Sequence, residues 1–460
     1  MHHCGYSSFY YDVAGVKLVT RDISGWGRTP VALSDVRDIA LHEASDLICG
    51  SRSFIPRGLG RGYGDCAVNG PGITAHTKAL NGFFVKDQIL DSGSGVSFDE
   101  ILQSIIPQGL FLPVTPGTRF VTLGGVIAAD VHGKNHHCDG SFGDFVEEID
   151  LMIGDGSIVK ISSTVNPRLF WATIGGMGLT GLILRAKIRL IPIETSLISN
   201  TTSICKNIDD LMEEMIRVDG VSRYSVAWLD TLASGKKLGR SVLTHGDHAK
   251  EFELDGMKGS NNLDYASTQR LSFPKIMPVG LLNKLTIRSF NESWYQKARL
   301  SRKTDFVKIN SFFYPLDGVR SWNYIYGRNG FIQHQFCVPD SASDLIPYVL
   351  GRLSKERIPS FLSVLKRFGS GNPGMLSFPT KGWTLAVDIP AGSENLGKVL
   401  DELDEKIVES SGRIYLAKDA RMNKKHLERM YPRLQEFREA KFEVDPHRVF
   451  ESNLSRRLGL

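Results

Sequence analysis

Four glycines alternate with larger residues in one short segment of the chain. The segment reads Arg57-Gly58-Leu59-Gly60-Arg61-Gly62-Tyr63-Gly64, and we call it the glycine cradle. Because glycine has no Cβ, such a run can curl tightly and turn several backbone N–H groups toward one point. A concave row of amide groups binds anions such as phosphates. The cradle and its two arginines therefore predict a diphosphate site, with an ordinary surface turn as the alternative.

The residues after the cradle exclude two well-known phosphate-binding motifs. A dinucleotide-binding Rossmann turn needs a helix directly after its glycines and an acidic residue about 20 positions later. Here the chain continues as Asp65-Cys66-Ala67-Val68-Asn69-Gly70-Pro71-Gly72, which cannot form a long helix. A P-loop would close with Gly-Lys-Ser or Gly-Lys-Thr, and the cradle does not. A different phosphate-bearing cofactor is therefore predicted.

Two more clusters of small residues follow the cradle along the chain. The first comprises Pro116–Arg119 and Thr122–Gly133, and the second comprises Gly175–Gly181. Small residues let the backbone approach a ligand closely. A structural turn could explain any one cluster, but three separate clusters indicate a large, extended and flat cofactor.

Three histidines, His132, His136 and His137, lie close together in the sequence. Paired histidines on a helix can bind a metal ion. However, Gly133 and Asn135 favour a loop, and no cysteine or carboxylate pattern completes a tetrahedral set. We therefore predict no metal site and interpret His132 as a neighbour of the cofactor, with a purely structural role as the alternative.

Strand-forming runs separated by glycine turns dominate the chain from about residue 31 to residue 192. The strand-like runs include residues 72–75, 111–114, 146–153 and 181–191, and helical patterns cover residues 34–45, 97–106 and 167–173. Because strands and helices do not alternate regularly, the pattern predicts an α+β fold rather than a doubly wound sheet. We predict a first domain over residues 1–195.

The chain after residue 195 has fewer glycines and is predicted to form a second α+β domain over residues 196–410. Its helical patterns at residues 342–357 and 393–410 flank a predicted strand at 383–389, and residues 235–302 have the pattern of an exposed insertion. Residues 411–460 resume the earlier pattern of glycine, strand and helix. We predict that this last segment rejoins the first domain.

The composition is that of an ordinary globular protein. The chain has 460 residues, of which 42% are hydrophobic and 23% charged, which suggests two or three domains. The N-terminus has no basic start followed by an apolar run, and no apolar stretch is long enough to span a membrane. The six cysteines show no CxxC pairing, which favours a reducing compartment. The predicted location is therefore cytoplasmic, with no signal peptide.

One stretch carries more positive charge than the rest of the chain. Between Tyr265 and Asn310 there are nine basic residues and two acidic ones, whereas the net charge of the whole chain is +5. The stretch is also rich in aliphatic and aromatic residues, especially from Leu271 to Tyr295. This combination suits anionic lipid headgroups or a lipid-linked phosphate, so peripheral contact with the inner face of a membrane is expected. An amphipathic helix with a solvated basic face is the alternative, and nucleic acid is not predicted because no known binding fold accompanies the charge.

Together these motifs resemble those of the vanillyl-alcohol-oxidase type of flavoenzyme. Such enzymes bind FAD in a two-part α+β domain, beside a substrate domain with an antiparallel sheet and flanking helices. Within this superfamily the chain is similar to the polyprenyl-phosphoryl-ribose 2'-oxidases. Besides the cradle, the segments that carry the resemblance are Pro116–Arg119, His132–His137, Gly140–Gly143, Gly175–Gly181, Leu376–Pro379, Ala417–Asp419 and Val444–Phe450. They span nearly the whole chain and keep the order seen in the family.

The resemblance implies a set of residues that bind FAD. The glycine cradle would hold the diphosphate. Tyr63 stands where relatives with covalent flavin often carry a histidine, so non-covalent FAD is expected. The other residues implied at the cofactor are Gly117, Thr118, Thr122, Leu123, Gly124, Gly125, Ala129, Asp130, Val131, His132, Gly178, Gly181, Ile183 and Tyr415.

The resemblance also implies the reaction. The 2'-hydroxyl of a polyprenyl-phosphoryl-β-D-ribose would be oxidised to a 2'-keto intermediate, and a separate NAD(P)H-dependent ketoreductase would complete the epimerisation to the arabinose donor. Loss of the hydroxyl proton needs a base within hydrogen-bond reach, and the candidates are Lys418, His132 and Tyr415. Lys418 could act if burial depresses its pKa. Its alternative role is to stabilise the reduced flavin.

The substrate residues implied by the resemblance are polar or aromatic. Lys134 and Lys366 would bind the phosphate, Gln333 and Gln335 the sugar hydroxyls, with Tyr314 and Trp228 beside them. The two glutamines are two positions apart in a predicted strand, so they share one face of it. A soluble aldonolactone or alditol oxidase that uses oxygen is the alternative enzyme. A flavin-binding protein without turnover is the alternative outside enzymology.

Overall fold

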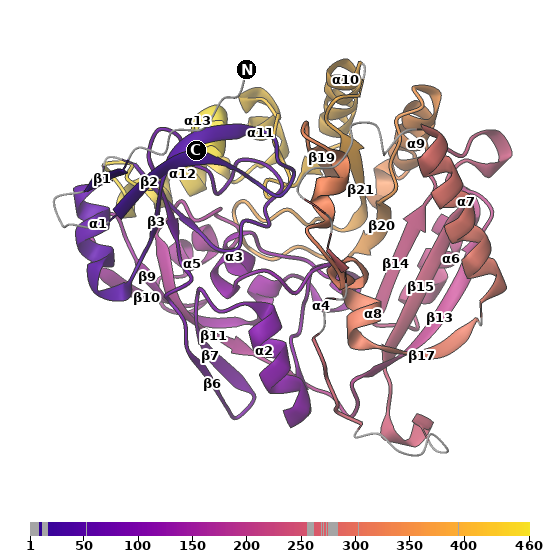
Figure 1. Cartoon of the computed structure of the whole chain (residues 1–460), viewed down its shortest axis with the longest axis horizontal. Coiled ribbons are helices and arrows are strands. Elements are labelled where there is room, and N and C mark those ends of the chain that lie inside the picture. Colours follow the sequence, from indigo (N-terminus) through magenta and orange to yellow (C-terminus); the bar gives the residue numbers. More distant parts are fainter. Residues whose placement is uncertain are drawn as a thin grey trace.

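The computed structural model describes residues 9–11, 17–51, 53–254, 262–267, 269, 271–272, 274, 284–301, 303–393 and 395–460. Three large sheets organise these residues (Figure 1). Two of them belong to the indigo and magenta half of Figure 1, and the third belongs to the half coloured magenta to orange. The yellow C-terminal helices lie beside the indigo strands, so the C-terminal segment returns to the half that contains the first described strands.

The first half of the molecule is built from two five-stranded sheets in the described residues. One has the order β1 (Phe9–Tyr11), β2 (Lys17–Ser24), β3 (Val31–Asp38), β5 (Ile73–His76) and β4 (Phe54–Arg57). The other has the order β10 (Ile158–Ile161), β9 (Val146–Met152), β11 (Leu182–Arg189), β7 (Ile89–Gly93) and β6 (Phe83–Lys86), and β8 (Leu110–Phe111) pairs with β12 (Ile191–Pro192). The helices of this half are α1 (Ala44–Gly50), α2 (Phe98–Ile105), α3 (Leu123–Ala128), α4 (His136–Asp139) and α5 (Pro167–Thr173). The predicted α+β class is confirmed.

The predicted helix at residues 34–45 is wrong. Residues 31–38 form β3, which pairs with β2 on one side and with β5 on the other. Ser34 and Val36 are buried at alternate positions, so the residues follow the period of a strand rather than of a helix. Only after a turn at Leu41–Glu43 does a helix begin, at Ala44. The pairing of β3 with a strand on each side determines its conformation, and a short local sequence pattern does not reveal such pairing.

Helix α2 shows why another prediction succeeded. The helix predicted at residues 97–106 begins with a capping box, in which the Ser97 hydroxyl accepts a hydrogen bond from the Glu100 N–H and the Glu100 carboxylate accepts one from the Ser97 N–H. Such reciprocal bonds satisfy two N–H groups that a helix start leaves free. The apolar side chains of α2, such as Phe98 and Leu102, are fully buried.

The second half contains an eight-stranded antiparallel sheet in the described residues. Its order is β17 (Thr304–Lys308), β13 (Leu197–Cys205), β15 (Ser241–His248), β14 (Tyr224–Leu229), β20 (Ser363–Phe368), β21 (Gly382–Pro390), β19 (Phe331–Pro339) and β22 (Arg413–Ile414). The helices of this half are α6 (Ile208–Asp219), α7 (Lys284–Leu300), α8 (Ile309–Phe313), α9 (Leu345–Lys355) and α10 (Leu396–Glu409), and a short pair joins β16 (Leu271–Ser272) to β18 (Val319–Arg320). The expected antiparallel sheet with flanking helices is therefore present.

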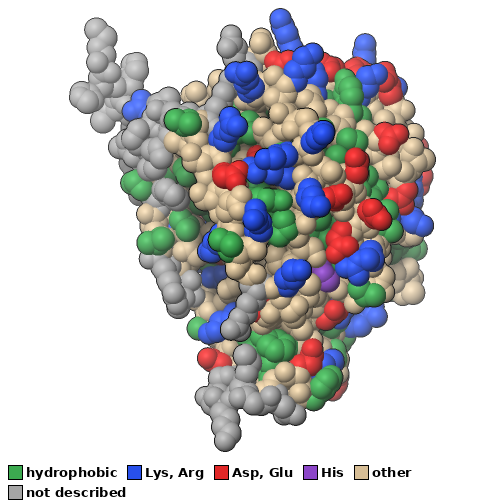
Figure 2. Space-filling model, turned by 90° about the vertical axis from the view of Figure 1, so that its right-hand side faces the viewer, with side chains coloured by type: hydrophobic (Ala, Val, Ile, Leu, Met, Phe, Trp, Pro, Cys, Tyr) green, Lys and Arg blue, Asp and Glu red, His purple; other side chains and the backbone are tan. Residues whose placement is uncertain are grey.

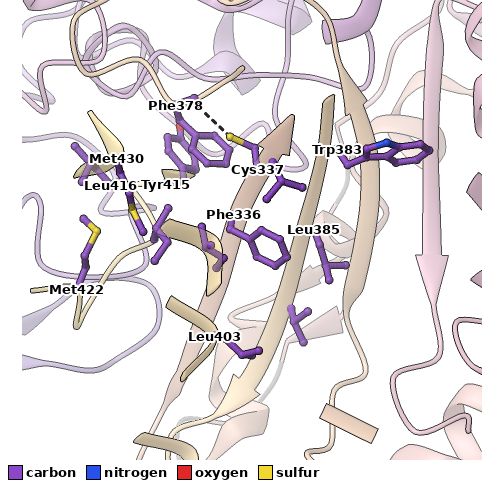
Figure 3. Packing of buried hydrophobic residues seen from close by; sticks show 14 of the residues in the cluster. Phe336, Cys337, Phe378, Trp383, Leu385, Leu403, Tyr415, Leu416, Met422 and Met430 are labelled. Carbon is purple, nitrogen blue, oxygen red and sulfur yellow. Dashed lines mark hydrogen bonds between the residues drawn. The ribbon is translucent and has the colours of Figure 1, made fainter. Parts of the chain in front are cut away.

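One face of this sheet is closed by helices and the other faces the first half of the molecule. Leu211 of α6, Val349 of α9 and Leu400 of α10 pack in one core with Leu229 and Leu385 of the sheet. Figure 3 shows part of this core, including the hydrogen bond that Cys337 Sγ donates to the Phe378 carbonyl at 3.3 Å. Side chains alternate along each strand, so the residues between the core positions point toward the first half.

Two features of the second half differ from the sequence expectations. Residues 241–248 are not part of an exposed insertion, because β15 lies inside the sheet between β13 and β14. Several residues of the predicted lipid-binding stretch, including 275–283, lie outside the described residues. The part of that stretch that can be placed is mainly α7.

The C-terminal segment packs on the first sheet. It contains α11 (Lys424–Met430), α12 (Leu434–Val444) and α13 (Asn453–Leu458). The Phe54 N–H donates to the Val449 carbonyl at 2.7 Å, and the rings of Phe54 and Phe450 meet edge to face with centroids 5.7 Å apart. The division of the chain at residues 195 and 410 remains a prediction, and the pairing of β22 with β19 would move the second boundary a few residues later.

Candidate active site

A cavity of about 710 Å³ lies where the two halves of the molecule meet. Its walls come from the glycine clusters of the first half and from the free face of the eight-stranded sheet. The predicted residues that line it are Gly58, Leu59, Gly60, Arg61, Gly62, Tyr63, Gly117, Thr118, Thr122, Gly124, Gly125, Ala129, Val131, His132, Lys134, Gly178, Gly181, Ile183, Trp228, Gln333, Gln335, Lys366, Tyr415 and Lys418. Segments that are hundreds of residues apart thus converge on one space.

Five predicted residues lie behind the cavity wall instead. The Arg57 guanidinium donates hydrogen bonds to two backbone groups, the Ala67 carbonyl at 2.9 Å and the Ser24 carbonyl at 2.7 Å. Gly64 allows a close approach to the C-terminal half, because a Cβ there would lie 1.7 Å from the Asp419 carbonyl oxygen. Leu123 is fully buried in the core of the first half. None of these three residues lines the cavity, and each contacts other parts of the protein instead.

Asp130 and Tyr314 are the other two. The Asp130 carboxylate accepts hydrogen bonds from the Gly143 N–H at 2.9 Å, from Asn372 Nδ2 at 3.0 Å and from the Ser377 hydroxyl. Burial raises the pKa of Asp130 to about 6. The Tyr314 hydroxyl lies 2.6 Å from Thr115 Oγ1 and is similarly buried. Through these hydrogen bonds, both residues connect segments that form the wall of the cavity.

The cradle side of the cavity fits a large polar cofactor. Gly60 has φ of +63°, which a side chain would strain, and a Cβ at Gly58 would lie 2.0 Å from Thr122 Oγ1. A Cβ at Gly117, by contrast, would meet no atom within 4 Å, so its backbone borders open space. The Arg61 guanidinium lies over the Trp26 ring at 3.8 Å, and its Nε has no hydrogen-bond partner among the described residues. Glycine backbone and an unsatisfied guanidinium suit the phosphates of FAD.

Sequence reasoning missed the residue that connects the cradle side to the second half. Asp317 accepts hydrogen bonds from Thr118 Oγ1 at 2.7 Å and from the Arg119 N–H at 2.8 Å. Its negative charge opposes the lowering of the Arg61 pKa that burial causes. No sequence pattern relates Asp317 to Thr118, because almost 200 residues separate them and only the fold brings them together.

Lys418 lies beside Tyr63 of the cradle, in the loop between β22 and α11. Its ammonium stands over the ring of Tyr63, 3.6 Å from the centroid, which is a cation–π contact. Burial lowers the pKa of Lys418, and the negative charge of Asp388 opposes this shift. The loop is fixed by a hydrogen bond from the Lys418 N–H to the Tyr415 carbonyl at 2.9 Å.

Asp388 is the second site residue that sequence reasoning missed. It lies on β21 directly across from Gln333 of β19, and the Gln333 amide donates a hydrogen bond to its carboxylate. Asp388 is fully buried, and burial raises its pKa while Gln333 and Lys418 oppose the rise. The strand register, and not the local sequence, places Asp388 beside Gln333, and its negative charge acts on the pKa of Lys418.

His132 is enclosed by aromatic rings and bound by an amide. Gln335 Nε2 lies 2.9 Å from His132 Nε2. The centroids of the Phe368 and Phe378 rings lie 4.8 and 5.6 Å from that of the imidazole. Burial, with the positive charge of Lys366, lowers the pKa of His132 well below its ordinary value, so the ring is neutral. Its Nδ1 has no hydrogen-bond partner among the described residues.

Tyr415 positions the wall and is poorly suited to accept a proton. Its hydroxyl donates to the Ala129 carbonyl at 2.8 Å, and burial raises its pKa well above the ordinary value. Its ring stacks on Phe378 with centroids 4.7 Å apart, as Figure 3 shows. Tyr415 therefore links the two halves of the molecule beside the cavity.

Lys134 and Lys366 place two more cations in the cavity. Burial lowers the pKa of Lys134 to about 7 and that of Lys366 to about 8. The Lys134 ammonium donates to the Phe312 carbonyl and lies 4.1 Å from the centroid of the Phe312 ring. Neither lysine forms an ion pair within the described part of the chain. The uncompensated charge makes this end of the cavity a favourable place for an anion.

The other two histidines of the sequence cluster bind protein atoms. His136 Nε2 lies 3.2 Å from the Ser141 hydroxyl, and His137 Nε2 lies 3.0 Å from the Ser222 carbonyl. His136 and His137 lie in α4, not in the loop that their neighbours suggested. Within the described residues, no three His, Cys, Asp or Glu side chains come together as metal ligands would.

Fold and site together define an FAD-dependent oxidoreductase with the two-part cofactor domain of the vanillyl-alcohol-oxidase type. Residues 43–162 match a family model described as an FAD binding domain. Over 456 residues the chain is 38% identical to the decaprenylphosphoryl-β-D-ribose oxidase of Mycolicibacterium smegmatis, covering 96% of this chain and 98% of that protein. The chain belongs to the decaprenylphosphoryl-β-D-ribose oxidase family. The predictions of FAD and of an oxidoreductase are confirmed.

Other relatives are similar to shorter parts of the chain. An uncharacterised protein of Streptomyces coelicolor is 35% identical over 79% of this chain and 100% of its own length. Cytokinin dehydrogenase 10 of rice is 30% identical over 30% of this chain and 27% of its own length.

None of the helices that the structure describes has both the length and the hydropathy of a membrane-spanning segment.

Proposed function

We propose that this chain oxidises the 2'-hydroxyl of a polyprenyl-phosphoryl-β-D-ribose to the 2'-keto compound, the first half of an epimerisation that yields an arabinose donor. The observation that carries the proposal is that Lys134, Lys366 and Lys418 share one cavity with the glycine cradle. A phosphate linked to a sugar would compensate the first two charges. The printed name of the relative from Mycolicibacterium smegmatis describes a substrate of this chemistry.

Lys418 is the residue best suited to take the hydroxyl proton. FAD, when bound, supplies the hydride acceptor for such an oxidation. Because burial lowers the pKa of Lys418, a useful fraction of its amine is neutral near physiological pH. After taking the proton, the ammonium is stabilised by the Tyr63 ring and by the nearby charge of Asp388.

His132 acts as a donor rather than as the base. Its Nε2 accepts a hydrogen bond from the Gln335 amide, so in the neutral ring the proton is on Nδ1. The lone pair of Nε2 is used by the Gln335 amide, and Nδ1 already carries a proton. The ring therefore has no free lone pair that could accept a proton from the substrate. The Nδ1–H, which has no partner among the described residues, can donate to an oxygen of a bound ligand. We assign Lys418 as the base, His132 as a donor and Tyr415 as a positioning residue.

The phosphate and the sugar would occupy adjacent parts of the cavity. Lys366 and Lys134 would bind the phosphate, while Gln333 and Gln335 would border the ribose. Two partners complete the proposal. A separate NAD(P)H-dependent ketoreductase would reduce the 2'-keto product with the opposite stereochemistry.

The second partner is an anionic membrane surface contacted by α7. Figure 2 looks at the side of the molecule that carries α7, where lysine and arginine side chains lie among hydrophobic ones. On α7, Leu285 is 74% and Leu300 84% exposed, and the basic residues Arg288, Lys297 and Arg299 are exposed beside them. Exposed apolar and basic side chains on one helix suit the headgroup region of a bilayer.

Anaerobic flavin spectra test the proposed reaction. Purified holoenzyme mixed with a polyprenyl-phosphoryl-ribose should lose its yellow absorbance, whereas free alditols and aldonolactones should leave it unchanged. Bleaching by the free sugars and not by the lipid-linked ribose would instead favour the aldonolactone or alditol oxidase. Sedimentation with vesicles of anionic and of zwitterionic phospholipid tests the membrane contact, which requires binding to the anionic vesicles.

A further inference from the structure

Part of the cavity is lined by carbon atoms that the oxidation of a sugar does not use. This part lies over β14, β15, β17 and β20 of the sheet and under α7. The residues that line it include Val226, Trp228, Val242, Val307, Val364, Phe290, Trp294, Phe361 and Leu362. We call it the apolar chamber. Because it is continuous with the space around Lys366 and Lys134, a single ligand can occupy both.

The strand register orders the cavity from polar to apolar. One row of paired residues crosses five neighbouring strands, in the order Gln335, Ala386, Val364, Trp228 and Val242. All five line the cavity. With about 4.8 Å between strands, the row spans about 19 Å from the amide of Gln335 to Val242. The side chains change along it from an amide, through a small methyl group, to large apolar groups.

The next row along the strands places the charge beside the apolar end. Lys366 of β20 lies two residues from Val364, on the same face of the sheet, and on the neighbouring strand β14 Val226 pairs with Thr244 of β15. Lys366 is therefore one strand away from the first apolar side chain of the chamber. A ligand that crosses the sheet from β19 to β15 would present a sugar, then an anion, and then a hydrocarbon.

Two polar groups of the chamber are already used by the protein, whereas Asn200 Oδ1 of β13, which also lines the cavity, has no hydrogen-bond partner among the described residues. Trp228 Nε1 donates to the Phe361 carbonyl at 3.0 Å, and Thr244 Oγ1 donates to the Val226 carbonyl at 3.3 Å. These bonds leave the indole ring and the threonine methyl group to face the cavity. Such a surface gains free energy by burying hydrocarbon and offers little to a polar ligand.

Helix α7 forms the roof of the chamber and its mouth. One side of α7 is anchored, because Ile287 is buried and the Asn291 amide donates to Asp230 Oδ1 at 2.8 Å. Phe290 and Trp294 line the cavity, yet they remain 45% and 41% exposed. Side chains that border both the cavity and the solvent mark an opening at this edge of α7.

We infer that the apolar chamber binds the hydrocarbon chain of the lipid phosphate, with the first isoprene units on the sheet and the rest leaving past Phe290 and Trp294. The inference rests on the proposed function, because the ribose and the phosphate fix which end of the ligand enters the chamber. The chain would emerge next to the exposed basic and apolar residues of α7. Such an exit lets the substrate stay partly in a membrane while its ribose reaches Lys418.

The test uses ligands that carry the phosphate and the chain but no ribose. Geranyl, farnesyl and geranylgeranyl phosphate are titrated into the holoenzyme by calorimetry, with inorganic phosphate as the probe without a chain. Burial of an added isoprene unit should tighten binding by about tenfold until the chamber is full. An affinity that does not change with chain length would overturn the inference.

Two variants locate the effect in the chamber. Val226→Phe should fill the floor beside Lys366 and weaken farnesyl phosphate by about tenfold or more, while the affinity for inorganic phosphate is kept. The double variant Phe290→Ser with Trp294→Ser changes only half-exposed side chains, and it should weaken geranylgeranyl phosphate more than geranyl phosphate. The matched control is Phe442→Ser on α12. The Phe442 side chain is 62% exposed, and the residue is far from α7 in the sequence. Equal effects of the control and of the α7 variant would contradict the proposed mouth.

Failure of this inference can be told apart from failure of the proposed function. If lipid-linked ribose bleaches the flavin but prenyl phosphates bind independently of length, only the chamber is refuted. If prenyl phosphates bind with the expected length dependence but no lipid-linked ribose bleaches the flavin, the chamber stands and the proposed oxidation is refuted.

Discussion

Gln335 Nε2 donates a hydrogen bond to His132 Nε2 across a distance of 2.9 Å and a separation of 203 residues. The bond joins the sheet of the second half to a cofactor-side loop of the first. It also decides the chemistry of the imidazole, since the nitrogen that accepts from Gln335 cannot also accept a substrate proton. The buried ring is thus held in a single tautomer, with its proton on Nδ1.

Replacing Gln335 should therefore change the reaction without removing the cofactor. Gln335→Met keeps the length of the side chain but cannot donate, so the tautomer of His132 is no longer fixed. We expect flavin reduction by the substrate to slow by about tenfold, which corresponds to about 1.4 kcal/mol and to the loss of one buried hydrogen bond. Stopped-flow spectra measure the rate. Gln103→Met on the exposed side of α2 is the control, and an equal rate in both variants would contradict the role of Gln335.

Lys418→Ala should abolish most of the turnover and keep the yellow colour. Loss of a general base typically costs a factor of about 100 to 10000, whereas Lys418 is only one of many residues around the cofactor. Single-turnover bleaching measures the effect. Lys366→Ala is the informative comparison, because loss of a phosphate contact should raise KM far more than it lowers kcat. If Lys418→Ala bleaches at the normal rate, the assigned base is wrong.

The pH dependence of flavin reduction should report the charge of Lys418. The base must be neutral, so the rate should rise with pH through the pKa of Lys418, which burial holds below the ordinary value. The charge of Asp388 raises that pKa. In Asp388→Asn this effect is lost, the pKa falls further, and the rising limb of the profile should move to lower pH. A limb that moves to higher pH, or not at all, would show that Asp388 does not act on Lys418.

Bound FAD should be released by acid precipitation of the protein. Cys66 and Tyr63 are nucleophilic side chains at the cradle, and neither is suited to attack the flavin. Burial raises the pKa of the Cys66 thiol to about 11 and that of the Tyr63 hydroxyl well above its ordinary value, so little thiolate or phenolate is present near pH 7. The absorbance should therefore appear in the supernatant, and yellow colour that stays in the pellet would indicate a covalent bond.

The cradle and α2 in the first half were predictable from the sequence because their signals are local, whereas the strand pairing of β3 overrode the local pattern at residues 34–45. Glycine spacing identifies the cradle, and the helical pattern at residues 97–106 identifies α2, whose start is stabilised by the capping box of Ser97 and Glu100. The residues that the sequence did not reveal act across the fold. Asp388 becomes visible only through its register with Gln333, and Asp317 only through its bonds to Thr118 and Arg119. Buried carboxylates have no sequence signature of their own, since the charges that compensate them come from other strands.

The same distinction explains the predicted residues that missed the cavity. Gly64 belongs to the alternating glycines, yet its lack of a side chain serves the packing of Asp419 rather than a ligand. Asp130 belongs to a small-residue cluster, yet its carboxylate binds Gly143, Asn372 and Ser377. A motif therefore locates a functional region, while the direction of each side chain depends on contacts with distant segments.

Gly64→Ala tests whether the cradle depends on its contact with the C-terminal half. A Cβ at residue 64 would lie 1.7 Å from the Asp419 carbonyl oxygen, which is backbone and cannot move away alone. Overpacking of this kind costs about 1–3 kcal/mol, and the shifted backbone would also disturb Tyr63 and Gly62 at the cavity. We expect a lower free energy of unfolding in urea together with a reduced content of FAD. In Gly50→Ala the new Cβ meets no atom within 4 Å, so stability should be kept or rise by up to about 1 kcal/mol. Equal stability and equal FAD content in the two variants would mean that the backbone contact between residues 64 and 419 does not hold the cradle.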